Sequence, residues 1–375
     1  MKKLILPIFL SLSALIFYSM PTKAISIKDP NYPNCVFNTV GGKTTNVSFD
    51  GFIESFDKSS IKKFVIPEKV EGYYTVTQIG YSAFNDCNNL EELVIPSTVN
   101  KINLSLDEYS SDTFTPFTGC NALRAIYVYA EQPPTHTLTD MYGDTYDAFS
   151  ELDHNKVNIY VPSSTVSAYK SSWNYFTNIL PATEEIQFDA ALNFRTYYSN
   201  HHLVKNGDLE AFTVSSIDEA QKELVLTPID DNVIPAGTGV ILKGQKGTTY
   251  TLDMAYSAPT LQSSNLLKGT ETDTVFTDYS TNNPIYILVN KENQPAFYPM
   301  TTTSSDNNYS LKAHKAFIPG SESKSNKYKI SDHITGIRNL EKTTDFNHKI
   351  YDLNGRICPA QKGIFILNRK KYFMK

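Results

Sequence analysis

Apolar and polar residues alternate in short segments along most of this chain, a pattern that predicts β-strands with one buried face. One such segment recurs between residues 61 and 162. Its copies lie at residues 61–67, 90–96, 123–129 and 157–162. Three of the four copies end in Val or Ile followed by Pro. Since Leu93 points to the opposite side from Val94, we expect the Leu93 side of each strand to face a core.

A second segment lies between these copies and also recurs. Residues 83–90 match residues 116–123, so Phe84 and Phe117, and likewise Leu90 and Leu123, are 33 residues apart. A fixed period of this length is typical of stacked units, none of which buries its apolar face alone. The spacing therefore predicts that equivalent residues lie side by side on a common apolar core.

The strand positions opposite that core form a candidate binding face. If Leu93, Ile126 and Ile159 point inward, the outward positions align across neighbouring strands. Exposed tyrosines are effective recognition anchors, so we predict a partner-binding face made of Val65, Val94, Tyr127, Tyr129 and Tyr160. Two alternatives are that an insertion at residues 103–115 covers this face and that its side chains only make cross-strand pairs.

Residues 186–330 carry a different series of short alternating segments. They lie at residues 194–199, 224–229, 239–244, 285–289 and 296–299, separated by turn residues. Many short strands joined by polar turns predict a β-sandwich or barrel. Between the two strand-rich regions, residues 163–176 show the best helical pattern. There Val166, Tyr169, Trp173 and Phe176 recur at spacings of three and four, with Ser163 or Ser164 as the expected N-cap.

The two ends of the chain have their own patterns. Residues 1–24 combine Lys2 and Lys3 with an apolar run and small residues before Ala24, which predicts a secretory signal peptide cleaved near Ala24. The alternative is an uncleaved anchor, but the run is short and contains Pro7. No later segment predicts a transmembrane helix. Residues 331–349 are polar and predict a linker. Residues 350–375 predict a small β meander that begins at an Asn354–Gly355 hairpin turn and packs on another element.

Composition supports β structure and limits the partners. The chain has 24 Tyr and 21 Phe, and only 19% of its residues are charged. Aromatic residues suit half-buried pleated surfaces. The net charge is −5 before the loss of the lysines in the signal peptide. Because nucleic-acid binding requires a basic face, this acidity argues against a nucleic-acid partner.

Candidate catalytic and metal-binding groups are few. His201 and His202 are adjacent and would face opposite sides of a strand, so we expect a solvated pair rather than metal ligands. Residues 230–232 and 237–239 lack the spacing of calcium and dinucleotide loops. Cys87 and Cys120 occupy equivalent positions in neighbouring repeats. Their side chains would point in parallel, which favours free thiols over a disulfide. We predict no catalytic residues, no cofactor, no metal site and no enzyme activity.

The order of the repeated residues resembles a known family. Residues 65–67, then 76–80, then Ala83, Phe84 and Cys87 are similar to the BspA-type leucine-rich repeats of Bacteroidetes surface proteins. Residues 159–162 followed by Tyr169 and Trp173 resemble the element that ends such arrays. Residues 350–375 look like the end of the C-terminal sorting domains of the same bacteria. The resemblance implies an exported protein, secreted or on the outer cell surface, that binds other macromolecules.

Together these observations predict a mainly β chain with three folded parts. A short leucine-rich-repeat solenoid occupies residues 25–182, a sandwich-like β domain residues 186–330, and the meander residues 350–375. The expected function is non-enzymatic adhesion or protein binding through the repeat domain, with a protein of the host or of a neighbouring cell as partner. The alternative is a glycan-binding accessory protein of a surface carbohydrate-capture system, in which exposed tyrosines and Trp173 stack on sugars.

Overall fold

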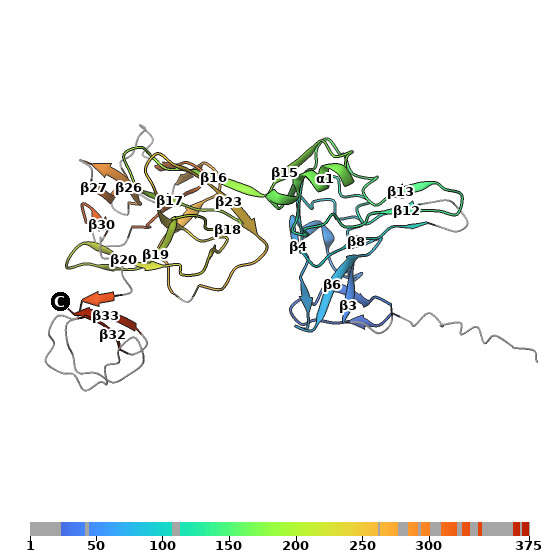
Figure 1. Ribbon diagram of the computed structural model, residues 1–375, viewed down its shortest axis with the longest axis horizontal. Coiled ribbons are helices and arrows are strands. Elements are labelled where there is room, and N and C mark those ends of the chain that lie inside the picture. Colours follow the sequence, from blue (N-terminus) through green and yellow to red (C-terminus); the bar gives the residue numbers. More distant parts are fainter. Residues whose placement is uncertain are drawn as a thin grey trace, which may run out of the picture. The chain divides into compact units, whose positions relative to one another are not determined.

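The protein is mainly β and divides into two units. A computed structural model describes residues 24–41, 45–106, 113–261, 263–276, 284–291, 294–300, 309–320, 325–330, 337–339, 363–367 and 370–374. Strands account for 44% of the residues and helices for 5%, which confirms the predicted class. The units are Met1–Leu180 and Pro181–Lys375 (Figure 1). The predicted signal peptide lies outside the described residues, apart from Ala24.

A five-stranded sheet forms one wall of the first unit. In the order of the sheet its strands are β15 (Asn178–Pro181), β14 (Asn158–Val161), β11 (Ala125–Val128), β7 (Glu92–Ile95) and β4 (Lys63–Val65). From β4 to β14 the strands run parallel. Leu93 lies beside Ile126, and Ile126 lies beside Ile159. The predicted pairing of the repeated segments is therefore confirmed.

A second sheet in the first unit mixes parallel and antiparallel pairs. Its order is β1 (Ser26–Ile27), β2 (Cys35–Thr39), β3 (Asn46–Phe52), β6 (Tyr74–Ile79) and β5 (Lys69–Val70), with β8 (Lys101–Ile102) also paired to β6. Gly51 in β3 has a φ of +114°, and a Cβ at this position would lie 2.8 Å from the carbonyl oxygen of Ala83. Only glycine allows the two segments to approach so closely.

The core of the first unit contains a column of stacked rings from Phe84, Phe117 and Phe149. The centroids of Phe84 and Phe117 are 5.9 Å apart with the rings 2° from parallel, and those of Phe117 and Phe149 are 5.3 Å apart at 6°. All three side chains are fully buried. We call these rings the phenylalanine column. The column follows from the 33-residue period because one ring from each repeat occupies the same place.

A helical segment closes this core. It consists of the 3-10 turn η2 (Ser163–Thr165) and α1 (Val166–Ser172), so the predicted helix is present but ends before Phe176. The expected serine N-cap is wrong, because neither element has a side-chain cap hydrogen bond. Trp173 is 0% exposed and packs 4.8 Å from Phe149. The expectation that Trp173 stacks on a sugar is therefore wrong, because its ring completes the core instead.

Two cysteines of the repeats are buried as free thiols. Cys87 and Cys120 lie at equivalent positions in the core. The Cys120 thiol donates to the carbonyl oxygen of Phe84 over 3.2 Å. Burial raises the pKa of the Cys87 thiol to about 11 and that of Cys120 to about 12. Both groups are thus protonated and poorly nucleophilic at neutral pH.

Two hairpins extend from the stacked strands of the first unit. The pair β9 (Ser105–Leu106) and β10 (Thr113–Phe114) lies in the insertion expected at residues 103–115. The pair β12 (Thr137–Thr139) and β13 (Thr145–Asp147) follows the third repeat. Figure 1 shows β12 and β13 projecting together from the body of the first unit.

Two larger sheets and two small strand pairs make up most of the described part of the second unit. A four-stranded sheet has the order β16 (Thr183–Gln187), β23 (Thr249–Ala255), β18 (His202–Val204) and β21 (Val233–Ile234). A seven-stranded sheet has the order β17 (Phe194–Tyr197), β22 (Val240–Lys243), β19 (Glu210–Asp218), β20 (Glu223–Pro228), β30 (Tyr328–Ile330), β27 (Gln294–Pro299) and β26 (Tyr286–Lys291). The small pairs are β24 (Lys268–Thr270) with β29 (Lys315–Phe317), and β25 (Thr274–Phe276) with β28 (Tyr309–Leu311). All five strands predicted here are present, as β17, β20, β22, β26 and β27.

Three short strands lie near the end of the chain. They are β31 (Ile337–Asn339), β32 (Gly363–Leu367) and β33 (Lys370–Met374), in the order β31, β33, β32. The last two match predicted strands of the meander. The strand β31 lies within the predicted linker at residues 331–349. It pairs in parallel with β33, so this part of the predicted linker is a strand. The predicted turn at Asn354–Gly355 lies outside the described residues. In the described part of the chain, no helix has the length and hydrophobicity to cross a membrane.

Candidate functional site

The predicted binding face is aligned as expected, but it is not exposed throughout. Val94 lies between Val65 and Tyr127, and Tyr127 lies beside Tyr160. Val65 is 41% exposed, whereas Val94 is 8% and Tyr127 is 7% exposed. The predicted exposure is therefore wrong for Val94 and Tyr127. Tyr129 and Tyr160 are half-buried.

Ring stacking accounts for part of this burial. The rings of Tyr127 and Tyr160 lie 4.6 Å apart and 11° from parallel, so each covers one side of the other. This is the cross-strand pairing that was the alternative to a binding face. Burial, and then the charge of Glu92, raise the pKa of Tyr129. Of the predicted face, Val65 alone retains a large exposed apolar side chain.

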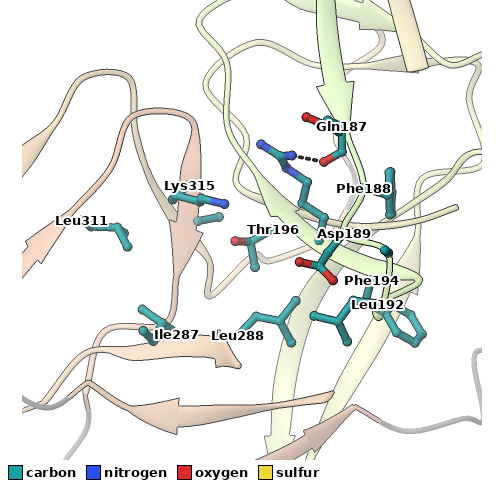
Figure 2. Close-up of a pocket in the computed structure, with 13 residues that line it drawn as sticks. Gln187, Phe188, Asp189, Leu192, Phe194, Thr196, Ile287, Leu288, Leu311 and Lys315 are labelled. Atoms are coloured by element: carbon teal, nitrogen blue, oxygen red, sulfur yellow. Dashed lines mark hydrogen bonds between the residues drawn. The ribbon is translucent and has the colours of Figure 1, made fainter. Parts of the chain in front are cut away.

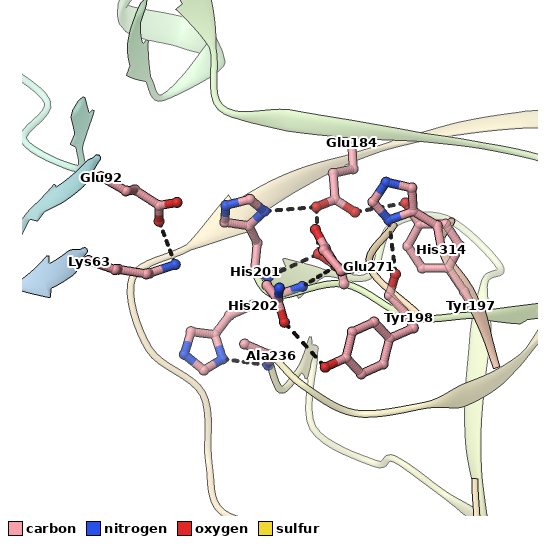
Figure 3. A network of polar contacts seen from close by, with 12 residues as sticks. Lys63, Glu92, Glu184, Tyr197, Tyr198, His201, His202, Ala236, Glu271 and His314 are labelled. Carbon is pink, nitrogen blue, oxygen red and sulfur yellow. Dashed lines mark hydrogen bonds and ion pairs between the residues drawn. The ribbon is translucent and has the colours of Figure 1, made fainter. Parts of the chain in front are cut away.

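Charged residues form ion pairs between the same strands. Glu91 pairs with Arg124 and, at 3.9 Å, with Lys62. Lys63 pairs with Glu92 (Figure 3). Lys62 and Arg124 are mostly exposed, so each pair adds little stability. By the alternation of the strands, the pair of Lys63 and Glu92 lies on the same side of the sheet as Val65 and Val94.

Among the described residues of the first unit, the most exposed large apolar side chains lie at the turn between β12 and β13. Met141 is 89% exposed and Tyr142 is 85% exposed. Asp140 orders this turn, because its Oδ1 accepts from the backbone N–H of Tyr142 at 2.8 Å and of Asp144 at 2.9 Å. Gly143 supplies the positive φ of +91° that the turn requires. We call residues 140–144 the hairpin tip. It presents two apolar side chains on an ordered backbone.

A polar network occupies the second unit around Glu184 (Figure 3). Its carboxylate accepts from the Tyr197 hydroxyl at 2.8 Å, from the Ser199 hydroxyl at 2.5 Å and from His201 Nδ1 at 3.0 Å. Only 12% of the Glu184 side chain is exposed. Burial favours the protonated acid, but the bonds from His201, Ser199 and Tyr197 outweigh it and lower the pKa of Glu184. The carboxylate is therefore ionised at neutral pH.

The arrangement of Ser199 in this network differs from that of a Ser–His catalytic pair. A serine nucleophile needs a histidine ring nitrogen to accept its proton. Here the Ser199 hydroxyl donates to Glu184 and accepts from the backbone N–H of His201 at 2.9 Å. The Ser199 hydroxyl thus donates to a carboxylate rather than to a histidine ring nitrogen, and the bonds satisfy polar groups that are largely buried.

The two adjacent histidines have separate partners. His201 contacts Glu184, whereas Nδ1 of His202 accepts from the backbone N–H of Ala236 at 2.9 Å. The predicted solvated pair is wrong, since both side chains are half-buried and hydrogen-bonded. Within the described ranges, no cluster of three or more His, Cys, Asp or Glu could hold a metal ion.

A cavity of about 570 Å³ lies elsewhere in the second unit (Figure 2). It is lined by residues of the 187–196 segment, of β26, of β28 and of β29. Two of its lining residues, Arg195 and Lys315, are basic. The short alternating segments predicted the strand that carries Arg195 but not β29, which carries Lys315. The position of both residues at one cavity depends on strand order and was not predicted.

No family model, curated protein or solved structure matches the chain. The similarity to BspA-type repeats therefore stays a prediction. It depends on the repeated residues themselves.

Proposed function

We propose that the chain is an exported, non-enzymatic protein that binds another protein through its first unit. In this proposal residues 25–182 are a short leucine-rich-repeat solenoid of the BspA type, and the second unit is a sandwich-like β module. The parallel register of β4, β7, β11 and β14 supports the repeat assignment, because equivalent residues pair across each step. The phenylalanine column supports it as well, since each ring belongs to a different repeat.

The hairpin tip is the observation that carries the binding role. Met141 and Tyr142 leave 89% and 85% of their area exposed, and burying them against a partner would remove this apolar area from water. Tyr is common among residues that dominate binding energy, and Met adapts to irregular apolar surfaces. Because Asp140 already orders the turn, little further entropy is lost on binding.

The charge around the tip indicates the kind of partner. Asp140 and Asp144 flank the two apolar side chains, and the whole chain carries a net charge of −5. An anionic membrane surface would repel this charge. The matching surface is an apolar cleft with a basic rim on a protein of the host or of a neighbouring cell.

We expect replacement of the two tip side chains to abolish this binding. The mature chain is screened against extracellular-matrix and cell-surface proteins and against an array of glycans, and each protein bound is titrated by surface plasmon resonance. The double substitution Met141→Ser with Tyr142→Ser should weaken binding by about 1,000-fold, since two buried anchors of about 2 kcal/mol each contribute about 4 kcal/mol. Circular dichroism checks that the variant is folded.

Tyr73→Ser provides the control. Tyr73 is 64% exposed in the same unit and lies outside the tip, so its replacement removes a similar aromatic surface without touching the proposed anchor. Protein binding that the double variant retains in full would refute the role of the tip. A chain that binds glycans but no protein would favour the glycan-capture function instead.

A further inference from the structure

Two basic side chains meet at the cavity of the second unit. Arg195 lies in β17 and Lys315 in β29, and both line the same space of about 570 Å³ (Figure 2). The guanidinium of Arg195 is held in place from two sides. One of its Nη atoms donates to the carbonyl oxygen of Gln187, and its central carbon lies 5.8 Å from the centre of the Tyr197 ring. Its Nε is buried and has no hydrogen-bond partner.

Neither cation is neutralised by a carboxylate. Every other cavity residue is uncharged except Asp189, whose Oδ1 accepts from the backbone N–H of Ala191 at 2.7 Å. No ion pair among the described residues includes Arg195 or Lys315. Burial lowers the pKa of both groups, and the charge of Arg195 lowers that of Lys315 further. Two partly buried cations thus repel each other, and a bound anion would relieve both costs.

Apolar side chains line much of the rest of the cavity, beside the polar residues Gln187, Asp189 and Thr196. Phe194, Ile287, Leu288 and Leu311 line it together with the ring of Phe188. Figure 2 shows Ile287 and Leu288 across the space from Gln187, with Thr196 between them and Lys315. A cavity of this size, lined by apolar side chains and a few polar groups, is typical of small-molecule sites.

We propose that this cavity binds a small organic carboxylate with an apolar body, whose carboxylate lies between Arg195 and Lys315. The planar guanidinium matches the oxygens of a carboxylate, and the Lys315 ammonium adds a second positive charge at the same cavity. The body of the ligand lies against Ile287, Leu288 and Leu311. An inorganic anion would satisfy the cations but leave this apolar wall in contact with water, so the wall favours the organic ligand.

Carboxylates of increasing chain length test this proposal. Binding of acetate, butyrate and hexanoate to the mature chain is measured by ligand-observed NMR and calorimetry, with hexanamide and inorganic phosphate as comparison probes. Affinity should rise about 4-fold for each added methylene, because burying one methylene contributes about 0.8 kcal/mol of binding free energy. Hexanamide and phosphate should both bind more weakly than hexanoate by about 10-fold, since each lacks one of the two matching features.

Charge-removing variants locate the site. Lys315→Gln and Arg195→Gln should each weaken hexanoate binding by about 10-fold. Arg195→Lys keeps the charge and should weaken it less. Lys312→Gln is the control, because Lys312 is 79% exposed, lies outside the cavity and makes the same change in net charge. Equal affinity for hexanoate in the wild type and in a folded Lys315→Gln variant would overturn the proposal. Equal affinity for hexanoate and hexanamide, or for hexanoate and phosphate, would overturn it as well.

Discussion

Replacing Phe117 with alanine is expected to destabilise the first unit by about 3–5 kcal/mol, the usual range for removing a buried phenylalanine ring. Phe117 is the middle ring of the phenylalanine column and contacts both Phe84 and Phe149 face to face. Its loss removes two ring contacts and leaves a cavity that the neighbouring strands, fixed by their parallel register, cannot close.

The chain carries a natural probe for this measurement. Trp173 is its single tryptophan and is fully buried beside Phe149. Its fluorescence should therefore change when the first unit unfolds in denaturant, and the shift of the midpoint between wild type and variant gives the loss of stability. Phe117→Leu keeps an apolar side chain and should cost less, so it serves if the alanine variant does not fold.

Phe114→Ala tests whether the column, rather than any phenylalanine, is responsible. Phe114 lies three residues earlier, in β10, and is 42% exposed. Its replacement should cost less than about 1 kcal/mol, as is usual for exposed positions. An equal loss of stability in the Phe114→Ala and Phe117→Ala variants would contradict the prediction that the phenylalanine column is the main element of the core.

The sequence predicted the repeated part of the fold well because one physical constraint acts there many times. Each copy must bury the same face against its neighbour, so alternation and the 33-residue spacing together specify strand, register and core. This explains why Leu93, Ile126 and Ile159 lie side by side as expected. The same reasoning does not determine how far a neighbouring ring covers an outward side chain, so Tyr127 was wrongly expected to be exposed.

The candidate sites depend on contacts between distant segments, and these were not predicted. Residues 140–144 contain the Asp and Gly residues that are typical of a turn. Nothing in the sequence indicated that Met141 and Tyr142 would be almost fully exposed there. The alternative glycan-binding function gave Trp173 a role in stacking on sugars, whereas its place next to Phe149 makes it a core residue. Arg195 and Lys315 are 120 positions apart in the chain, and no local pattern relates them.

Replacing Glu184 with alanine is expected to destabilise the second unit by about 3–5 kcal/mol, as when one partner of a buried charged group is removed. The donors of Tyr197, Ser199 and His201 would each lose the acceptor that the carboxylate provides. Hydrogen exchange of peptides covering residues 184–201 measures this loss locally, because weaker structure opens more often.

Glu184→Gln separates the hydrogen bonds from the charge. The amide oxygen can still accept from Ser199 and His201, so this variant should be more stable than the alanine variant. The pKa of Glu184 is lowered in the folded protein, so its charge stabilises the fold above the unfolded-state pKa of about 4.3. That stabilisation is lost as the pH falls through the folded-state value. The stability of the wild type relative to Glu184→Gln should therefore be constant near neutral pH and shrink in acid. A difference that is the same at neutral pH and well below the unfolded-state pKa would show that the ionised carboxylate is not what holds this network together.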